Sequence, residues 1–536
     1  MAIDTIVIGS GIGGLTAAVT LARAGQQVLV LEQHYLPGGW THSFTLEGHS
    51  FSPGVHYLGE LGEGRHFRRL FEGLELEGLG FWELDPDGFD HILIGDERLD
   101  VPKGRQAWQR RLCERFPQQA KAIRRYFDVV VSIEQQLRRV DEYLSFPRVL
   151  ALPFLAPQLT RWGFRTLADV FDHAGITDPL LRGALSARCG NHGLAPSRVS
   201  FPMHAAMIAH YFGGAYYPQG GARRITSAFV RALRRHGGEI RLRTRVHQIL
   251  VEGGRAVGVE LEGGERIRCD HVVSNADAVT TYTKLLPPGA APKVEKKARN
   301  MEPSVSCLSL FAAVDDDLVA RGYDGGNYWW YREPDVDGIY RRTEKAQPGD
   351  PLDTLFLSVS SLKDPGRGNG TQHTLEMFTF VPFAPFERFL SLECGDRGAD
   401  YEALKTRMTD AMLDAAEHIM PGLREHLVFR ELGTPATNVH YCEAYRGSCY
   451  GTAKTPWQVG PFALGMTSPI EGLSLCGAST LSHGLAGAST SGLLVAGRLL
   501  GWSSQEEGFA PETGAVEVRP ASPPRHRAPW EPPTAA

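Results

Sequence analysis

The sequence predicts an α/β fold in which a Rossmann-like dinucleotide-binding domain, completed by a β-meander, is interleaved with an α+β substrate domain. Three observations support this prediction. A glycine-rich turn joins an apolar run to a helical pattern at residues 5–33. Short alternating segments separated by glycine-rich turns occupy residues 237–277. A short apolar run and a stretch of small residues at 473–497 are typical of a late strand and helix that return to the first sheet.

The first element is the segment TIVIGSGIGGLTAAVTLARAGQQVLVLEQ, which predicts strand, turn, helix and strand. Its glycines and acid are Gly9, Gly11, Gly13, Gly14 and Glu32. In such a unit Gly9 permits the tight turn, Gly11 lets the backbone approach a pyrophosphate, and Gly14 lets the helix pack on the strand. Free N–H groups at the helix N-terminus attract phosphates, and Glu32 can accept hydrogen bonds from a ribose diol. The segment therefore predicts a site for FAD or NAD rather than NADP.

Composition limits the classes of partner. The chain has 536 residues, 42% hydrophobic and 22% charged, which is enough for a large core in several domains. A formal net charge of −5 without a long basic block argues against a nucleic-acid partner. The eight cysteines show no paired spacing, which predicts reduced thiols in a cytoplasmic protein and no metal site. No signal peptide is expected, and because no run of about 18 apolar residues occurs, no membrane-spanning helix is expected either.

The sequence after Glu32 favours FAD. LEQHYLPGGWTHSF runs through Gln33 into a turn at Gly38 and Gly39, followed by Ser43. This series resembles the two-dinucleotide-binding-domain flavoproteins of the phytoene desaturase, carotenoid isomerase and amine oxidase superfamily. The resemblance implies bound FAD, with the Gly-Gly turn beneath its diphosphate. Trp40 stands where many members have Arg, which favours a branch other than the amine oxidases.

Further segments are similar to the all-trans-retinol 13,14-reductase (retinol saturase) branch of that superfamily. They are FSPGVHYLGEL (51–61), FPMHAAMIAHYFGGAYYPQGGARRIT (201–226), GSCYGTAKTP (447–456) and LSLCGASTLSHGLAGASTSGLLVAG (473–497). Together with the N-terminal motif they cover most of residues 3–500. The resemblance implies additional FAD contacts at Gly54, Val55, Val246, Ala276, Gly477, Ala478, Leu485 and Ala486. The alternative for the last segment is a small-residue helix that packs closely on a strand.

The stretch SPGVHYLG is expected to line the substrate side of the flavin. Saturating a polyene double bond adds a hydride at one carbon and a proton at its neighbour, and a Tyr or His beside the flavin can supply the proton. The first candidates are His56 and Tyr57, followed by His204, His210 and Tyr450. The alternative for each is a packed, hydrogen-bonded core residue.

The resemblance implies an FAD-dependent oxidoreductase that saturates a carbon–carbon double bond of a retinoid, carotenoid or similar isoprenoid. Desaturation and cis–trans isomerisation are alternatives on the same scaffold, and a non-catalytic flavin-containing lipid-binding protein is an alternative of another class. Only one GxGxxG unit precedes a helix, so electrons are expected from transiently bound NAD(P)H or from another redox partner.

The expected organisation has six segments. FAD-binding parts are assigned to 1–75, 216–290 and 446–502, a helical cap and substrate region to 76–215, a substrate domain to 291–445, and a disordered tail to 503–536. Within the cap region, 105–144 has helical periodicity. The apolar, Pro-broken stretch 145–167 predicts either a patch that docks on lipid at the cytoplasmic face or a buried loop and helix beneath the cap.

Overall fold

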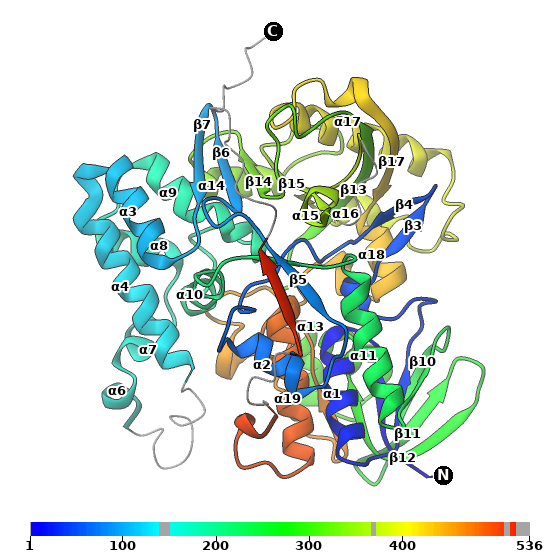
Figure 1. Cartoon of the computed structure of the whole chain (residues 1–536). Helices are drawn as coiled ribbons and strands as arrows, with labels where there is room; N and C mark the ends of the chain where they lie inside the picture. Colours follow the sequence, from blue (N-terminus) through cyan, green and yellow to red (C-terminus); the bar gives the residue numbers. More distant parts are fainter. Residues whose placement is uncertain (1, 139–150, 366–370, 509–514, 521–536) are drawn as a thin grey trace.

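The computed structural model describes residues 2–138, 151–365, 371–508 and 515–520 (Figure 1). The first sheet has a parallel core with the strand order β9-β2-β1-β12-β18. Its strands are β1 (Ile3–Ile8), β2 (Val28–Leu31), β9 (Glu239–Arg241), β12 (Arg266–Ser274) and β18 (Leu473–Leu475). The late strand predicted to return to this sheet is β18, which pairs with β12. β2 is apolar and wholly buried, as expected for a parallel strand that is covered on both faces.

The predicted β-meander is confirmed. β10 (Val246–Glu252), β11 (Arg255–Leu261) and the first part of β12 pair in antiparallel order. The second part of β12 pairs in parallel with β1. This one strand therefore belongs to both the meander and the nucleotide-binding sheet.

Three helices cover one face of the first sheet: α1 (Ile12–Arg23), α11 (Arg223–Arg235) and α19 (Gly484–Leu499). Helices α1 and α19 come unusually close because both are rich in small residues. A Cβ at Gly492 of α19 would collide with the carbonyl oxygen of Gly13 in α1. The small-residue segment therefore packs on a helix as well as beside a strand, and this contact fixes how the two helix N-termini stand relative to each other.

The second sheet has the strand order β17-β13-β16-β15-β14-β6-β7. Its strands are β6 (Asp90–Ile94), β7 (Glu97–Val101), β13 (Ser306–Asp315), β14 (Asn327–Tyr331), β15 (Thr354–Val359), β16 (Gln372–Val381) and β17 (Leu427–Gly433). On one face, Tyr328 and Trp330 of β14 pack in a core with α17 (Ala399–Glu417). On the other face, Trp329 and Tyr331 pack in the core that also contains the helical lobe.

The helical lobe stands at one side of the molecule in Figure 1. The helices expected within 105–144 are confirmed over 105–137; residues 139–150 lie outside the described residues. The lobe consists of α3 (Arg105–Arg115), α4 (Ala120–Leu137), α6 (Leu152–Leu155), α7 (Pro157–Trp162), α8 (Leu167–Ala174), α9 (Pro179–Ser186) and α10 (Phe201–His210). Their apolar residues, such as Phe127 and Phe171, form one core with β6 and β14.

Further short strands and helices connect the two sheets and the lobe. They are β3 (Phe44–Leu46), β4 (His49–Phe51), α2 (His66–Gly73), α12 (Ala278–Thr280), α13 (Pro292–Arg299), α14 (Val336–Thr343), α15 (Ser360–Lys363), α16 (Ala384–Glu387) and α18 (Pro435–Cys442). In the part of the chain that the structure describes, no helix is both long and apolar enough to cross a membrane.

The described tail from residue 503 departs from the expected disorder in two places, a 3-10 helical turn at Gln505–Gly508 and a strand beyond it. β19 (Glu517–Pro520) pairs in parallel with β5 (Gly80–Glu83), which also pairs with β8 (Tyr216–Pro218) (Figure 1). The preceding Val516 is buried in the core beneath the first sheet. Composition misled the prediction here, because the Pro-rich and charged residues around this segment hide a short strand whose partner lies far away in the sequence.

A buried charge cluster joins β6, β7 and the loop before β14. The His91 ring is fully buried, with Nδ1 2.6 Å from Asp100 Oδ1 and Nε2 2.8 Å from Asp324 Oδ1. The two carboxylates raise the pKa of His91 against the opposing effect of burial. The His91 and Arg98 cations lower the pKa of Asp100 despite its burial. The cluster is therefore a network of ion pairs, in which the His91 and Arg98 cations and the Asp100 and Asp324 carboxylates favour one another's charged forms.

We expect His91→Asn to destabilise this edge of the second sheet by roughly 1.5–3 kcal/mol, because Asp100 and Asp324 lose the charged hydrogen-bond donor between them while Asp100 keeps Arg98. The pKa of His91 is raised on folding, so its contribution is complete below the unfolded value and is lost as pH rises through the folded value. The difference between wild type and variant should therefore be larger at about pH 6 than at about pH 9. Hydrogen exchange of the β6 and β7 amides measures it; an equal difference at both pH values would contradict the assignment.

Candidate functional site

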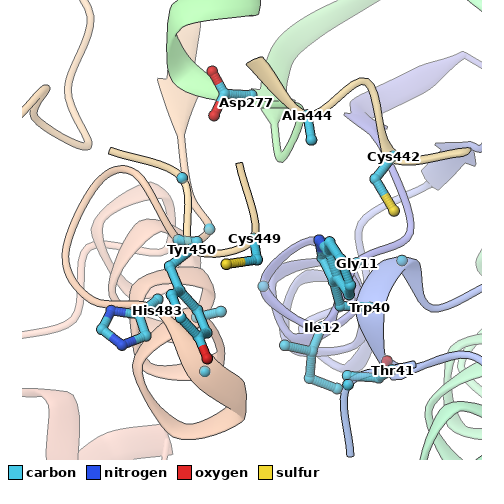
Figure 2. Close-up of a pocket in the computed structure, with 18 of the residues that line it drawn as sticks. Gly11, Ile12, Trp40, Thr41, Asp277, Cys442, Ala444, Cys449, Tyr450 and His483 are labelled. Carbon is cyan, nitrogen blue, oxygen red and sulfur yellow. The ribbon is translucent and has the colours of Figure 1, made fainter. Parts of the chain in front are cut away.

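A cavity of about 880 Å³ lies between the first sheet and the second. Its wall combines the turn between β1 and α1, the segment 38–41, the N-terminal part of α19, helix α10 and strands β14 to β16. Figure 2 shows part of this wall, with Gly11, Ile12 and Trp40 at one side and Tyr450 and His483 at another. One continuous space therefore extends from the glycine-rich turn to the second sheet.

The glycine-rich turn forms one end of the cavity. Gly9 adopts the left-handed conformation, and helix α1 begins without a side-chain cap, so its first N–H groups are free to meet a ligand. Glu32 lies at the end of β2 and is buried. Its Oε2 accepts hydrogen bonds from Ser10 N (2.8 Å) and Ser10 Oγ (2.6 Å), and its Oε1 accepts one from His34 N (2.8 Å). The carboxylate is thus held rigidly at the cavity wall.

Fourteen of the predicted cofactor-binding residues line this cavity. They are Gly9, Gly11, Gly13, Glu32, Gln33, Gly38, Gly39, Gly54, Val246, Ala276, Gly477, Ala478, Leu485 and Ala486. Two of these glycines are also required by tight packing, since a Cβ at Gly38 would lie 2.7 Å from Thr226 Oγ1 and one at Gly13 would lie 2.9 Å from the carbonyl oxygen of Ala488. The first turn of α19 has no side-chain cap and also faces this space.

Three residues expected to contact the cofactor lie outside the cavity wall. Gly14 does not line the cavity; it lets α1 approach β1, because a Cβ there would collide with the carbonyl oxygen of Gly9. Val55 is buried in the core beneath the first sheet. Ser43 is half-buried and lies outside the cavity wall. These residues are neighbours of cavity residues in the sequence, but a sequence pattern does not show whether a side chain points into the cavity or away from it.

The second sheet provides an aromatic row. Trp329, Phe356 and Phe378 are directly opposite one another on β14, β15 and β16, and all three line the cavity. Their rings lie 4.6 Å apart from one strand to the next, Trp329 to Phe356 and Phe356 to Phe378. Phe380 extends this apolar wall. Of the aromatic segment NYWWYREP, the cavity wall includes Trp329. Tyr328 and Trp330 face the other side of the sheet, and Tyr331 packs in the core with the helical lobe, where its hydroxyl donates to the carbonyl oxygen of Ala187.

His56 and Tyr57 both line the cavity but have different partners. The His56 ring packs on Phe356 and Phe378, with centroids 5.1 and 5.7 Å away. Its Nδ1 lies 3.8 Å from Oε2 of Glu376. Tyr57 is more deeply buried, and its hydroxyl lies 3.5 Å from Asp90 Oδ2. Burial first, and then the Asp90 carboxylate, raise the pKa of Tyr57 well above its usual value.

The other three proton-donor candidates are less suited to that role. His204 is fully buried and does not line the cavity. His210 lines it, but its Nε2 accepts a hydrogen bond from Gly59 N (2.9 Å), and burial lowers the pKa of His210 to about 4. The Tyr450 hydroxyl donates to the carbonyl oxygen of Gly190 (3.1 Å). For His210 and Tyr450 the structure favours the alternative of packed, hydrogen-bonded core side chains, whereas His204 is packed with neither ring nitrogen hydrogen-bonded in the described structure.

Several residues around the cavity had no signal in the sequence. The buried Asp90 binds Arg188 (Oδ2 to NH2, 2.6 Å), and Lys363 is buried on α15. Glu376 follows a run of polar residues in β16, and His192 lies at the cavity wall with both ring nitrogens buried and unbonded in the described structure. Buried charges at isolated positions have no characteristic spacing, so only tertiary contacts could reveal them. Nowhere in the described ranges do three or more His, Cys, Asp or Glu residues form a group that could hold a metal ion.

Comparison with known proteins identifies the family of the chain. The family model described as flavin containing amine oxidoreductase matches residues 12–500. The chain belongs to this flavin-dependent family. It is 31% identical over 528 residues to all-trans-retinol 13,14-reductase from Rattus norvegicus, covering 93% of this chain and 86% of the relative. It is 27% identical to prolycopene isomerase from Daucus carota, covering 92% and 80%. The resemblance to the retinol saturase branch is thereby confirmed.

Solved structures show the same fold. An oxidoreductase from Methanosarcina mazei superposes with a TM-score of 0.62 at 19% identity, covering 92% of this chain and 99% of that one. Putrescine oxidase superposes with a TM-score of 0.60 at 15% identity, covering 94% and 99%. The expected α/β flavoprotein fold with two interleaved domains is confirmed by these comparisons.

The flavoprotein site fits FAD, its expected cofactor. The uncapped N-terminus of α1 and the glycine-rich turn suit a diphosphate, and Glu32 suits a ribose diol. The second uncapped N-terminus, that of α19, faces the same cavity and suits the negative charge that a reduced flavin carries. FAD supplies hydride-transfer chemistry when bound there. The chain is therefore an FAD-dependent oxidoreductase.

We expect Glu32→Gln to weaken FAD binding roughly 10- to 100-fold, because charge-assisted hydrogen bonds to the ribose contribute about 1.5–3 kcal/mol. FAD titration of the apoprotein measures the affinity. Glu239→Gln is the matched control, since Glu239 is an exposed glutamate on β9 of the same sheet. Equal affinity of the Glu32 variant and wild type would show that this carboxylate does not contact the cofactor.

Proposed function

We propose that this flavoprotein saturates a carbon–carbon double bond of an apolar polyene, a retinoid, carotenoid or related isoprenoid. The observation that carries the proposal is the pairing of an aromatic row with an adjacent proton donor. Phe356 and Phe378 are stacked and Trp329 meets Phe356 edge-on, so the three rings form an apolar wall along which a conjugated chain can lie. His56 stands directly against two of these rings.

Saturation requires two hydrogens, one delivered as a hydride with two electrons and one as a proton. In this proposal bound FAD would supply the hydride for one alkene carbon, and His56 gives the proton to the neighbouring carbon. The π bond is consumed as the two C–H bonds form. The aromatic wall excludes water and holds the alkene in place, which favours transfer over loss of the proton to solvent.

Relatives support saturation as the leading reaction. The identity to proteins named all-trans-retinol 13,14-reductase reaches 31–32%, against 27% for proteins named prolycopene isomerase. One 28% identical relative from Danio rerio is named an inactive all-trans-retinol 13,14-reductase, so turnover has to be measured directly. We further propose that NAD(P)H, bound transiently, or another redox partner supplies the two electrons to the oxidised cofactor.

The first test is anaerobic. The flavin is reduced with dithionite, all-trans-retinol or lycopene is added, and both chromophores are followed. We expect the flavin to reoxidise while the polyene absorption moves to shorter wavelength, because one conjugated double bond is lost. A polyene that changes only its cis–trans pattern while the flavin stays reduced would indicate an isomerase. A bound polyene with neither change would indicate a lipid-binding protein without turnover.

We propose that the protein is cytoplasmic and docks on the cytoplasmic face of a membrane through the stretch 145–167. In its described part, Phe154 is 87% exposed, whereas Trp162 is buried. Phe164 is also exposed and stacks on Trp457, which belongs to a distant segment and is 65% exposed. Exposed aromatic side chains at this density are unusual on a surface that meets only water.

Charge supports a lipid surface as the occupant of this patch. Arg161 and Arg165, which precede and follow Phe164 in the sequence, are both exposed. Arginines near a bilayer attract anionic headgroups. Phe462 also contacts Phe164 and Trp457, so the aromatic cluster has three members. The free cysteines in the described chain are compatible with a reducing compartment.

We expect the double variant Phe164→Ser with Trp457→Ser to bind anionic phospholipid vesicles at least about tenfold more weakly, since burying each aromatic ring contributes on the order of 1.5–3 kcal/mol. Cosedimentation with phosphatidylserine-containing vesicles measures the binding. Leu392→Ser, at an exposed leucine outside the patch, is the control. Undiminished binding by the double variant would exclude this patch as the docking surface.

A further inference from the structure

A second row of side chains follows the aromatic row on the cavity side of the second sheet, and it is polar. It consists of Asp90, Asn327, Ser358 and Glu376, which are direct register partners from β6 to β16. All four are buried, with at most 3% of any of them exposed. Two carboxylates in such a position are costly unless each has a cation or donors that satisfy it.

The carboxylate at the β6 end is fully satisfied. Asp90 Oδ2 lies 2.6 Å from Arg188 NH2, and Oδ1 accepts from Asn327 Nδ2 at 2.9 Å. The indole N–H of Trp329 lies 3.3 Å from the same oxygen. Asp90 therefore has an ion-pair partner and hydrogen bonds on both oxygens.

Lys363 lies over the middle of the row. Its Nζ donates to the carbonyl oxygen of His56 (2.8 Å), to Asn327 Oδ1 (2.5 Å) and to Ser358 Oγ (2.7 Å). An ammonium group has three N–H bonds, and these three acceptors use all of them. Burial lowers the pKa of Lys363 to about 7, although the charges of Glu376 and Asp90 act in the opposite direction. Lys363 can offer Glu376 a nearby charge but no hydrogen bond.

The carboxylate at the β16 end is only half satisfied. Glu376 Oε1 accepts a hydrogen bond from Ser52 N at 3.1 Å. Its Oε2 is buried and has no hydrogen bond within the described structure, and the same holds for Nδ1 of His56. These two atoms lie 3.8 Å apart and face each other. A small rotation of either side chain closes the gap to a hydrogen bond.

We propose that Glu376 is a positioning residue for His56: it accepts the Nδ1–H of the imidazole and so leaves Nε2 as the nitrogen that exchanges a proton with the substrate. This inference rests on the proposed function, in which His56 is the proton donor. The backbone of the loop is held at the same time, because Lys363 binds the His56 carbonyl oxygen. The ring and its loop are thus fixed from two sides by two buried, oppositely charged groups.

The hydrogen bond to Glu376 holds neutral His56 in its Nδ1–H tautomer. When the imidazolium gives the Nε2 proton to the alkene carbon, the remaining proton stays on Nδ1 and on its hydrogen bond to Glu376. Other titratable or charged groups surround this pair from several elements, and they bear on its pH dependence. They are Lys363 from α15, Tyr57 from the same loop, Asp90 from β6 and Arg188 from the segment after α9.

The test is nitrogen NMR of the oxidised holoenzyme carrying ¹⁵N-histidine. The chain has 19 histidines, so the His56 signals are assigned by their loss in His56→Gln. At alkaline pH we expect wild-type His56 in the Nδ1–H form. A wild-type His56 in the Nε2–H form would overturn the proposal without any variant of Glu376, so failure of a variant to fold does not prevent the test.

Glu376→Gln gives the sharper result. Ser52 N–H retains the amide oxygen, so the amide NH2 faces Nδ1 of His56 as a donor and forces the Nε2–H tautomer. Polyene-dependent flavin reoxidation should also slow by about 10²-fold, since that is the usual contribution of a general acid. Glu376→Asp keeps the charge and should retain the Nδ1–H form. Glu431→Gln, at an exposed glutamate on β17, which β13 separates from β16, should change neither readout.

The two readouts separate the two proposals. An unchanged tautomer in Glu376→Gln, with a folded protein, overturns the role of Glu376 even if polyenes reoxidise the flavin. If Glu376→Gln reverses the His56 tautomer but no polyene reoxidises the flavin of the wild-type enzyme, the role of Glu376 stands and the proposed reaction is rejected. A reversed tautomer with an unchanged reoxidation rate would also overturn the proposal, because Nε2 would then not be the atom that delivers the proton.

Discussion

The joint between the two sheets depends on one buried ammonium group. Lys363 Nζ ties the loop that carries His56 to side chains of β14 and β15, so three separate parts of the chain meet at a single atom. A cation in this position is tolerable only because Asp90 and Glu376 lie on the same buried row. The geometry of the cavity wall beside His56 therefore rests on a balance of charges that no solvent screens.

The second sheet divides its work between its two faces and between neighbouring rows. One face is an ordinary apolar core against α17. On the cavity face, the aromatic row containing Phe356 provides surface for an apolar ligand, while the next row supplies fixed charge. Because strand residues two apart share a face, apolar binding and proton handling can lie side by side on rigid strands. The loop that carries His56 is held against these strands, because Lys363 binds the His56 carbonyl oxygen.

The sequence predicts motifs that lie within a short stretch of chain, but it does not predict contacts between residues that are distant in the chain. The turn from Gly9 to Gly14, the meander and the late strand follow from patterns within short windows, and each is present. Asp90, Arg188 and Glu376 become partners only when distant strands pair, so no spacing in the chain announces them. His204 and Val55 show the opposite error, since proximity in sequence to site residues did not bring their side chains to the cavity.

The late strand β18 has a consequence for how the protein matures. β18 pairs with β12, and helix α19 then closes the cavity against α1, yet both elements are synthesised after every strand of the second sheet. Such pairing of distant segments is slow to form. The earlier parts of the nucleotide-binding sheet must wait with an open edge, a state that exposes apolar surface. The wall of the FAD site is consequently complete only after these late elements have joined the sheet.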